Sequence, residues 1–354
     1  MEKILVSIIC PVFNRIELIK ECIDSVAAQN YSNWELIVID DDSDDGTYEY
    51  IQERSSNDDR IKVYRKNGSR GAPSSRNIGI KISKGKYLIF LDSDDVLSSS
   101  CLRDRVLFME KNQTLDFSVY PQQVFHKEAG DSNLLVNIKT KEDELDRFLT
   151  IGQSLDVPWV TCSVIWKKSS IIMKNISWDE EILGFQDVQF NVAALTSGMK
   201  YQMLEDVATD SFWRRHSGAR IGLSLSIPEA TGSHEKLLLD IWKGLRKNKI
   251  NHEKRRVRIL KSVITLCFSE YILNREYIKA NKLLKMLVKE SMVTKNEKMH
   301  LYLRVLIGKL SRYSLNYSYR LERKIVSVNK EFYKPLGAGN FLKHNLDTLN
   351  HQCL

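Results

Sequence analysis

The sequence predicts an α/β protein, in which a mostly parallel sheet with flanking helices is followed by a helical C-terminal region. Up to about residue 115, short apolar runs rich in β-branched residues alternate with stretches of helical periodicity, a pattern typical of βαβ units. Beyond about residue 229, the apolar residues recur at helical spacing. The chain has 354 residues, which is enough for one large domain or for two.

The four expected strands are continuous apolar runs, which suits strands covered on both faces. They span residues 4–10, 34–40, 61–65 and 87–92. Helices are expected from residue 14 onward and over residues 46–54 and 72–83. Asn14 and Glu17 have the spacing of a capping box at the start of the first helix. Strands joined through helices take right-handed crossovers and form a parallel sheet.

Between residues 116 and 226 the pattern is mixed, with short strands expected over 116–121 and 160–166. A boundary is expected where helical periodicity takes over. We therefore predict three parts: a catalytic domain over residues 1–227, a basic helical domain over 228–334 and a tail over 335–354.

Charge also separates these parts. Residues 235–334 hold 25 Lys and Arg against nine Asp and Glu, although the net charge of the whole chain is only +8. The six cysteines are scattered and form no CxxC pair, which indicates reduced thiols and a cytoplasmic protein. No apolar run reaches the roughly 18 residues of a transmembrane helix. The apolar N-terminus lacks a small-residue cleavage site, so secretion is not expected.

Three of the four expected strands end in polar clusters, and parallel strands bring their carboxyl ends to one edge of the sheet, where ligands bind. Asp92 and Asp94 have the i, i+2 spacing that directs two carboxylates to the same side of an extended chain. Such a pair is stable when a hard divalent cation lies between it and a diphosphate. A solvated Asp-rich turn is the alternative, which the position at the end of a buried strand disfavours.

The other polar clusters are compatible with a nucleotide site. Asp41 leaves the second strand, where its carboxylate can accept a hydrogen bond from a base N–H. Asp45 and Thr47 suit the cap of the next helix. Arg76 lies early in the third helix, and it either faces the carboxylates and the nucleotide or is an ordinary surface residue.

The chain resembles family 2 glycosyltransferases in four stretches with the same order and spacing: VSIICPVFNR, VIDDDSDDGT, GAPSSRNIG and FLDSDD. The resemblance covers about residues 4–222 and implies the GT-A fold, a Rossmann-like sheet. It also implies a reaction that inverts the anomeric carbon of a nucleotide-sugar. The resemblance implies that Pro11 and Phe13 line the base pocket and that Asp41 binds the base, which is commonly uracil. It implies that Asp92 lies by the ribose and that Arg76 supports the nucleotide site. It also implies that Asp94 binds the Mn²⁺ or Mg²⁺ that bridges the diphosphate.

Two later stretches extend the resemblance. LGFQDVQFNVAAL is similar to the segment in which these enzymes carry Glu-Asp, so it implies that Asp187 is the catalytic base and that Gln186 replaces the Glu. Inversion needs one base on the acceptor face, although a helix N-terminal carboxylate is the other interpretation of Asp187. FWRRHSGARIGLS is similar to a later loop, which implies His216 as a metal ligand and Arg215 or Arg220 as diphosphate partners. A surface histidine is the alternative for His216.

Two further features have open interpretations. Trp159 is either a stacking wall for a sugar or a core residue. Arg255, Arg256 and Arg258 lie beside apolar helical positions. They either contact anionic lipid headgroups, form a solvated face or belong to a dimer interface. Nucleic-acid binding is not expected, because no RNA-binding motif accompanies the charge.

The expected function is that of an inverting, metal-dependent glycosyltransferase. It would move a sugar, preferably from a UDP-sugar, to a hydroxyl of a glycan or a lipid-linked acceptor. By resemblance, the setting is bacterial cell-surface polysaccharide synthesis, in the cytoplasm and peripheral at the inner face of the membrane. A sugar nucleotidyltransferase would need a glycine-rich N-terminal phosphate loop, and residues 10–19 contain no glycine. A non-enzymatic scaffold that recruits partners through its basic helices is disfavoured by the intact Asp94 and Asp187.

Overall fold

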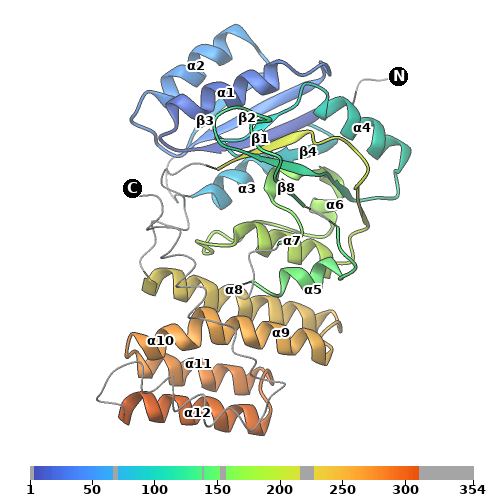
Figure 1. The fold of residues 1–354 in the computed structure, drawn as a ribbon. Helices are drawn as coiled ribbons and strands as arrows, with labels where there is room; N and C mark the ends of the chain where they lie inside the picture. Colours follow the sequence, from blue (N-terminus) through green and yellow to red (C-terminus); the bar gives the residue numbers. More distant parts are fainter. Residues whose placement is uncertain (1–3, 67–70, 138, 152–156, 216–226, 311–354) are drawn as a thin grey trace. The chain divides into compact units, whose positions relative to one another are not determined.

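The computed structural model describes residues 4–66, 71–137, 139–151, 157–215 and 227–310. It divides the chain into two compact units (Figure 1). The sheet unit comprises Met1–Phe148, Asp156–Ser233 and Gly244–Ile250. The helical unit comprises Leu149–Leu155, His234–Lys243 and Asn251–Leu354. The domain boundary predicted at residue 227 stays a prediction.

The main sheet of the sheet unit has seven strands in the order β10-β6-β9-β4-β1-β2-β3. Its strands are β1 (Val6–Val12), β2 (Trp34–Asp40), β3 (Ile61–Arg65), β4 (Tyr87–Phe90), β6 (Phe117–Val119), β9 (Val164–Lys167) and β10 (Tyr201–Met203). The first four strands run parallel to one another, whereas β9 is antiparallel to both β4 and β6. The predicted α/β class and its mostly parallel N-terminal strands are therefore confirmed.

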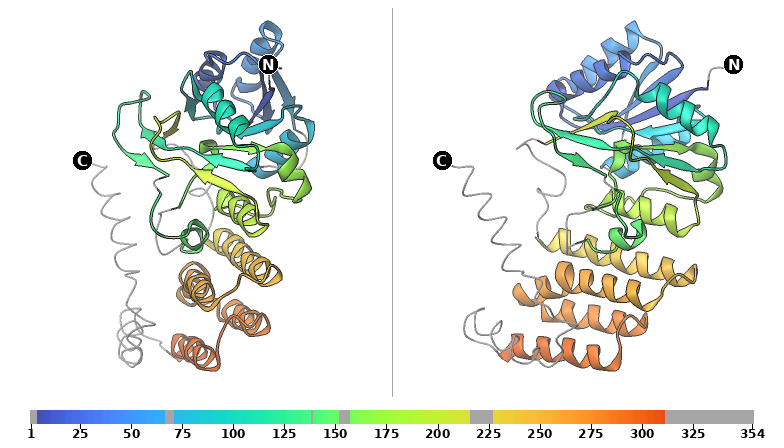
Figure 2. Two further views of the ribbon diagram at one scale, coloured as in Figure 1. Left: turned by 90° about the vertical axis from the view of Figure 1, so that its right-hand side faces the viewer. Right: turned by 45° about the vertical axis from the view of Figure 1, so that its right-hand side comes forward.

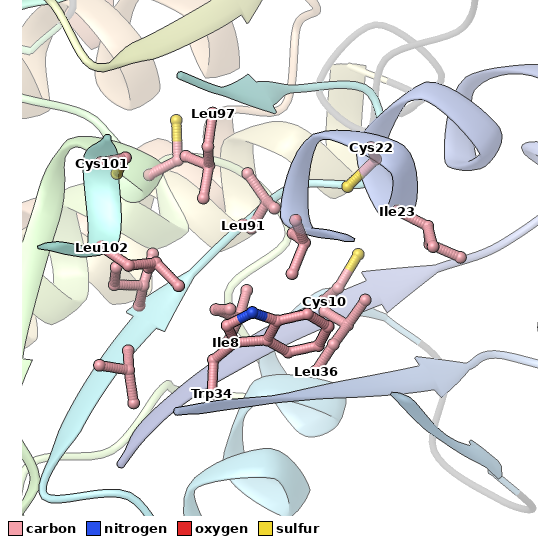
Figure 3. Packing of buried hydrophobic residues seen from close by; sticks show 14 of the residues in the cluster. Ile8, Cys10, Cys22, Ile23, Trp34, Leu36, Leu91, Leu97, Cys101 and Leu102 are labelled. Atoms are coloured by element: carbon pink, nitrogen blue, oxygen red, sulfur yellow. The ribbon is translucent and has the colours of Figure 1, made fainter. Parts of the chain in front are cut away.

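Helices cover both faces of this sheet. The connecting helices are α1 (Ile16–Ala27), α2 (Thr47–Asn57) and α3 (Ala72–Ile82). Ile8 of β1 packs with Cys22 of α1 in the hydrophobic cluster of Figure 3, whereas the next residue, Ile9, faces α3. A Cβ atom on Gly79 of α3 would lie 2.3 Å from Cγ2 of Ile9, so the close approach of helix and strand requires glycine. Burial on both faces explains why these strands are continuous apolar runs.

A second, four-stranded sheet has the order β5-β11-β7-β8. Its strands are β5 (Val96–Leu97), β7 (Gln122–Phe125), β8 (Leu135–Val136) and β11 (Ser211–Arg214). The sequence did not predict this sheet, because two of its strands have only two residues and show no periodicity. The unit also contains α4 (Cys101–Lys111), α5 (Glu144–Phe148), a 3₁₀ turn (Thr161–Ser163), α6 (Lys168–Met173) and α7 (Gln186–Thr196).

The predicted capping box at the start of α1 is wrong. The helix begins at Ile16, and no side chain of its own first turn caps it. Instead, the backbone N–H groups of Arg15 and Ile16 donate to Thr47 Oγ1 and Asp45 Oδ2, at 3.0 and 3.2 Å. Asn14, with φ of 48°, pairs with the loop after β2 rather than with the helix. A tertiary contact therefore replaces the local one.

The helical unit includes the central turns of α8 (Ile227–Lys247) and further helices that lie side by side in Figure 2. They are α9 (Glu253–Val263), a π-helical turn (Ile264–Phe268), α10 (Ser269–Leu273), α11 (Tyr277–Lys289) and α12 (Lys295–Leu310). Arg256 is buried and donates to Glu253 and Glu297 at 2.6 and 2.8 Å, so its assignment to a lipid-facing or solvated surface is wrong.

Two expectations about the whole chain can be compared with the described residues. None of the described helices combines the length and the apolar character needed to cross a bilayer. Five cysteines are buried and free, as predicted; they are Cys10, Cys22, Cys101, Cys162 and Cys267. Cys353 lies outside the described residues.

Candidate functional site

The loops that follow β1 and β2 interlock at the carboxyl edge of the main sheet. Asn14 Nδ2 donates to Asp44 Oδ1 at 2.8 Å, and the backbone N–H of Asp44 donates back to Asn14 Oδ1 at 3.0 Å. Asp45 accepts hydrogen bonds from the first turns of both α1 and α2. The predicted capping role of Asp45 is therefore confirmed, and it fixes the position of both loops.

Asp41 has a buried cationic partner that the sequence did not reveal. Lys66 Nζ lies 2.8 Å from Asp41 Oδ1, and the backbone N–H of Gly71 donates to Oδ2 at 2.6 Å. The lysine side chain is 4% exposed, and its ammonium also donates to Ser74 Oγ at 2.7 Å. Each carboxylate oxygen of Asp41 retains a second lone pair, so this geometry leaves it able to accept a hydrogen bond from a ligand.

The turn after β4 holds three carboxylates. Asp92 Oδ1 accepts a hydrogen bond from Arg76 Nη2 at 2.6 Å, and Asp92 is partly exposed. Asp95 is 2% exposed and accepts the backbone N–H of Arg214 at 3.0 Å. Burial raises the pKa of Asp95 well above its usual range, and the charges of Asp94 and Asp92 raise it further. Negative charge is therefore concentrated around this turn.

This donor set fits a divalent cation that is bound together with a phosphate group. Asp92 and Asp94 are both partly exposed carboxylates, and oxygen ligands of this kind suit Mg²⁺ and Mn²⁺. Over the described residues, no group of three or more His, Cys, Asp and Glu side chains is arranged to hold a metal ion. The fit is thus to a cation that takes part of its coordination from phosphate and water.

Arg76 connects two parts of the site. Its side chain is 5% exposed, with Cζ 4.3 Å from the ring centroid of Trp178. Besides Asp92, its guanidinium donates to Gln186 Oε1 at 3.3 Å, whereas its buried Nε has no hydrogen-bond partner. Arg76 is therefore a buried partner of Asp92 and not an ordinary surface residue, whereas its role at the nucleotide stays a prediction.

Asp187 lies in the first turn of α7, next to this guanidinium. The preceding Phe185 adopts a left-handed conformation with φ of 57°, which ends the incoming loop and starts the helix. Asp187 remains partly exposed, yet burial of its carboxyl raises its pKa. The charge of Asp92 adds to this effect, while the N–H of Val188 and the charge of Arg76 oppose it. Gln186, which stands where the resemblance implies a Glu, is a partner of Arg76.

The remaining predicted residues differ in how the structure places them. Pro11 is buried in β1. It lies two residues beyond Ile9, which is the last residue of β1 that pairs with β4. Phe13 follows the strand and is 45% exposed. The Arg215 side chain is exposed, and its backbone N–H donates to Phe125 O at 2.7 Å. His216 and Arg220 lie outside the described residues.

The interpretation of Trp159 as a stacking wall for a sugar is wrong. Its side chain is fully buried, and it packs against the rings of Phe117, Phe148 and Tyr201, with centroid distances of 6.0, 5.0 and 5.5 Å. Trp159 is therefore part of an aromatic core, the alternative that the sequence left open.

Sequence reasoning missed Arg214, the neighbour of the predicted Arg215. Arg214 is 5% exposed, its Nε donates to the carbonyl oxygen of Asp94 at 3.0 Å, and its Nη2 pairs with Glu21. It thereby fixes the backbone of the acidic turn from β11. Both arginines occur in FWRRHSG, and the pairing of β11 decides which of them points inward.

A second missed pair supports the same region. Arg105 of α4 is fully buried and forms a double hydrogen bond with Asp210, at 2.8 and 2.6 Å. Its Nη1 donates to Cys162 O at 2.9 Å, and the thiol of Cys162 lies 3.3 Å from Asp95 Oδ2. The available signal was a charged residue within the apolar stripe of a helix.

Comparisons with known proteins bear on the family and the fold of the chain. The family model described as "Glycosyl transferase family 2" matches residues 7–170. EpsJ of Bacillus subtilis (strain 168), described as an uncharacterized glycosyltransferase, is 31% identical over 206 residues, which are 57% of this chain and 59% of EpsJ. The match thus spans less than two thirds of that relative.

Two further proteins resemble larger parts of the chain. WfaP of Escherichia coli, a UDP-Glc:alpha-D-GlcNAc-diphosphoundecaprenol beta-1,3-glucosyltransferase, is 30% identical over 216 residues, which are 61% of this chain and 79% of WfaP. The crystal structure of S. aureus TarS in complex with UDP-GlcNAc has a TM-score of 0.65 at 17% identity, and the match covers 89% of this chain and 91% of that one. This likeness shows that the fold is GT-A-like. The chain belongs to glycosyltransferase family 2.

Proposed function

We propose that this protein is an inverting glycosyltransferase that moves a sugar from a UDP-sugar to a hydroxyl of a glycan or lipid-linked acceptor, in bacterial cell-surface polysaccharide synthesis. The observation that carries the proposal is the double contact of Arg76, which bonds Asp92 at the end of β4 and Gln186 beside Asp187. One guanidinium thus holds a nucleotide-side carboxylate and the start of the helix that bears the base. The name of WfaP, which specifies a UDP-glucose donor and a diphosphoundecaprenol-linked acceptor, supports this choice of substrates.

The donor is bound by the loops after β1, β2 and β4. Asp41, oriented by Lys66 and Gly71, accepts a hydrogen bond from the base N–H. Pro11 and Phe13 form the wall against which the base lies, and Asp92 contacts the ribose. Among the nucleobases, this arrangement suits one that presents an N–H to an ionised carboxylate, as uracil does.

The diphosphate is held at the acidic turn. Asp94 would hold Mn²⁺ or Mg²⁺, with His216 as a further ligand, and a bound cation would supply positive charge to the departing diphosphate. Arg215 and Arg220 are proposed to bind the phosphates directly, as guanidinium groups do well. Arg214 and Arg76 hold the turn and Asp92 in place, so the carboxylates do not have to reorganise on binding.

Asp187 is proposed as the general base. Its carboxylate takes the proton of the acceptor hydroxyl while the hydroxyl oxygen attacks C1 from the face opposite the diphosphate. The bond between C1 and the phosphate oxygen breaks, and its electron pair leaves with the diphosphate. A carboxylate with a raised pKa is a stronger base than an ordinary aspartate, and the raised pKa of Asp187 therefore favours this role.

The test is the isosteric variant Asp187→Asn. UDP release from a panel of UDP-sugars, with and without acceptor, should fall by about a thousandfold, because a general base contributes roughly 10² to 10⁴ in rate. UDP binding measured by calorimetry should stay within about twofold of wild type. Turnover near wild type would remove Asp187 from the mechanism, and wild-type protein that neither binds UDP nor turns over any donor would overturn the proposed function.

A further inference from the structure

Helix α12, the last described helix of the helical unit, has apolar residues on its outer face. Met299, Tyr302 and Leu306 are 55%, 58% and 41% exposed. Their spacing of three and four residues places them along one stripe of the helix. Leu301 and Val305, on the opposite side, are almost fully buried and pack within the unit. We call Met299, Tyr302 and Leu306 the outer stripe of α12.

The charged residues of α12 on the side of the outer stripe are all lysines. Lys295, Lys298 and Lys309 are exposed, and they lie seven, four and seven residues from Tyr302, so they share its side of the helix. Glu297 is the only acidic residue of α12, and it faces inward. Its carboxylate accepts hydrogen bonds from Arg256 at 2.8 and 3.0 Å, which leaves the outer side without a carboxylate of its own helix.

The neighbouring helix α11 has the same character. Ile278 is 87% exposed, and Lys282, Lys285 and Lys289 follow it at four, seven and eleven residues, all of them exposed. Residues 277–310 together contain eight Lys and Arg against two Asp and Glu. Apolar side chains flanked by lysines are typical of helices that lie in the headgroup region of a membrane.

We infer that the outer stripe of α12 docks this protein onto an anionic lipid surface. Met299 and Leu306 would enter the boundary between headgroups and acyl chains, Tyr302 suits the interface itself, and the lysines would meet the anionic headgroups. The inference rests on the proposed function in one respect, because a lipid-linked acceptor presents its hydroxyl at such a surface.

Charge argues against the other two occupants of the stripe. A second copy of the chain would bring the same lysines face to face, with no carboxylate of α12 to pair with them. Residues 311–354, which follow α12 in the chain, contain seven Lys and Arg against three Asp and Glu, so they too are net basic. An anionic membrane is the occupant whose charge is complementary.

The experiment measures co-flotation of the full chain with vesicles of phosphatidylcholine alone and of phosphatidylcholine with phosphatidylglycerol. Wild type should float with the anionic vesicles only, and added salt should weaken binding. Met299→Glu/Leu306→Glu should lower the bound fraction at least about tenfold. The matched control is Ile172→Glu/Met173→Glu, which changes two residues of α6 that are 60% and 75% exposed, and it should bind like wild type.

Three results of the flotation assay would overturn the inference. They are absence of wild-type binding to anionic vesicles, wild-type binding by Met299→Glu/Leu306→Glu, and an equal loss of binding in the α6 control. If the stripe variant turns a lipid-free dimer into a monomer, the stripe is a subunit interface instead. If the stripe variant lowers the Tm of the lipid-free protein far more than the α6 control does, residues 311–354 cover the outer stripe instead of a membrane.

A second readout separates this inference from the proposed function. UDP binding, measured on the same preparations without vesicles, should be equal in wild type, the stripe variant and the control. Vesicle binding without UDP binding would leave the membrane surface standing and remove the proposed function. UDP binding without vesicle binding would overturn the membrane inference and leave the proposed function in place.

Discussion

The two ends of the candidate site treat negative charge differently. At the loop after β2, Asp41 has a buried cation of its own, because Lys66 Nζ lies 2.8 Å from its Oδ1. At the turn after β4, Asp92 shares Arg76 with the region of Asp187, and the pKa values of both Asp95 and Asp187 are raised. The Asp41 carboxylate is thus neutralised in advance, which suits a neutral base, whereas the turn after β4 favours a ligand that brings positive charge with it.

The largest expected effect separates Asp94 from its neighbour Asp95. Asp94→Asn should remove the gain in UDP binding on addition of Mn²⁺ and lower turnover by about a thousandfold, because the cation offsets charge on the leaving group. In Asp95→Asn the residue replaced is a buried carboxyl whose pKa is raised. UDP binding by this variant should therefore still respond to Mn²⁺ and to EDTA. Calorimetry with and without EDTA distinguishes them. An unchanged metal response in Asp94→Asn would contradict the comparison.

Arg76→Met tests the shared cation. We expect turnover to fall by about a hundredfold, since Asp92 and the start of α7 lose their common donor. The free energy of unfolding should fall by only about 1 to 2 kcal/mol, because water partly solvates the Asp92 carboxylate that loses its partner. Arg256→Met is the control: it breaks a buried pair with Glu297 in the helical unit, so it should lose stability while turnover of the folded protein stays near wild type. Equal turnover losses in both variants would indicate a purely structural role for Arg76.

Lys66→Met tests the neutralised end. The Kd for UDP should rise by about tenfold, because Asp41 loses the cation that orients it, while kcat at saturating donor should change little. Lys62→Met removes another lysine–carboxylate pair, with Glu35 at 2.6 Å, from β3, the strand that Lys66 follows, and it should leave the Kd unchanged. A fall in kcat with an unchanged Kd would place Lys66 in the chemical step and break the comparison.

The smallest effect concerns pH. Asp187 must be ionised to act as a base, so the acid limb of kcat should lie above the pKa of about 3.9 of an ordinary aspartate. The folded protein holds this proton to higher pH than the unfolded chain, so ionisation of Asp187 costs stability as pH rises between the two pKa values. Asp187→Asn should therefore raise the Tm at about pH 7 and change it less below about pH 4. A higher Tm gain at the lower pH would contradict the sign.

Much of the sheet unit was predictable from local pattern. The strands β1 to β4 are apolar runs whose burial on both faces the composition already indicates, and their order with the helices determines a parallel sheet. The short strands β5 and β8 were not predictable, because each has only two residues, and β5 forms through pairing with the distant β11. The capping box failed for the same reason: Thr47 and Asp45 reach α1 from another loop.

The residue types of the candidate site were predictable from the sequence, whereas most contacts between these residues were not. Asp41, Arg76 and Asp92 were named from their positions, and Asp187 was named from the resemblance. The structure places Arg76, Asp92 and Asp187 within one electrostatic cluster. Lys66 gave no signal, because a lysine after an edge strand is ordinarily solvated and only the fold turns it onto Asp41. Trp159 was ambiguous, because aromatic residues serve cores and sugar sites alike.

The reciprocal bonds between Asn14 and Asp44 have an evolutionary consequence. A change at one of these positions removes a partner from the other, so the two loops should be inherited as a matched pair. We expect positions 14 and 44 to covary among homologues. A chimera that takes only one loop from a relative should lose donor binding, and one that takes both should keep it.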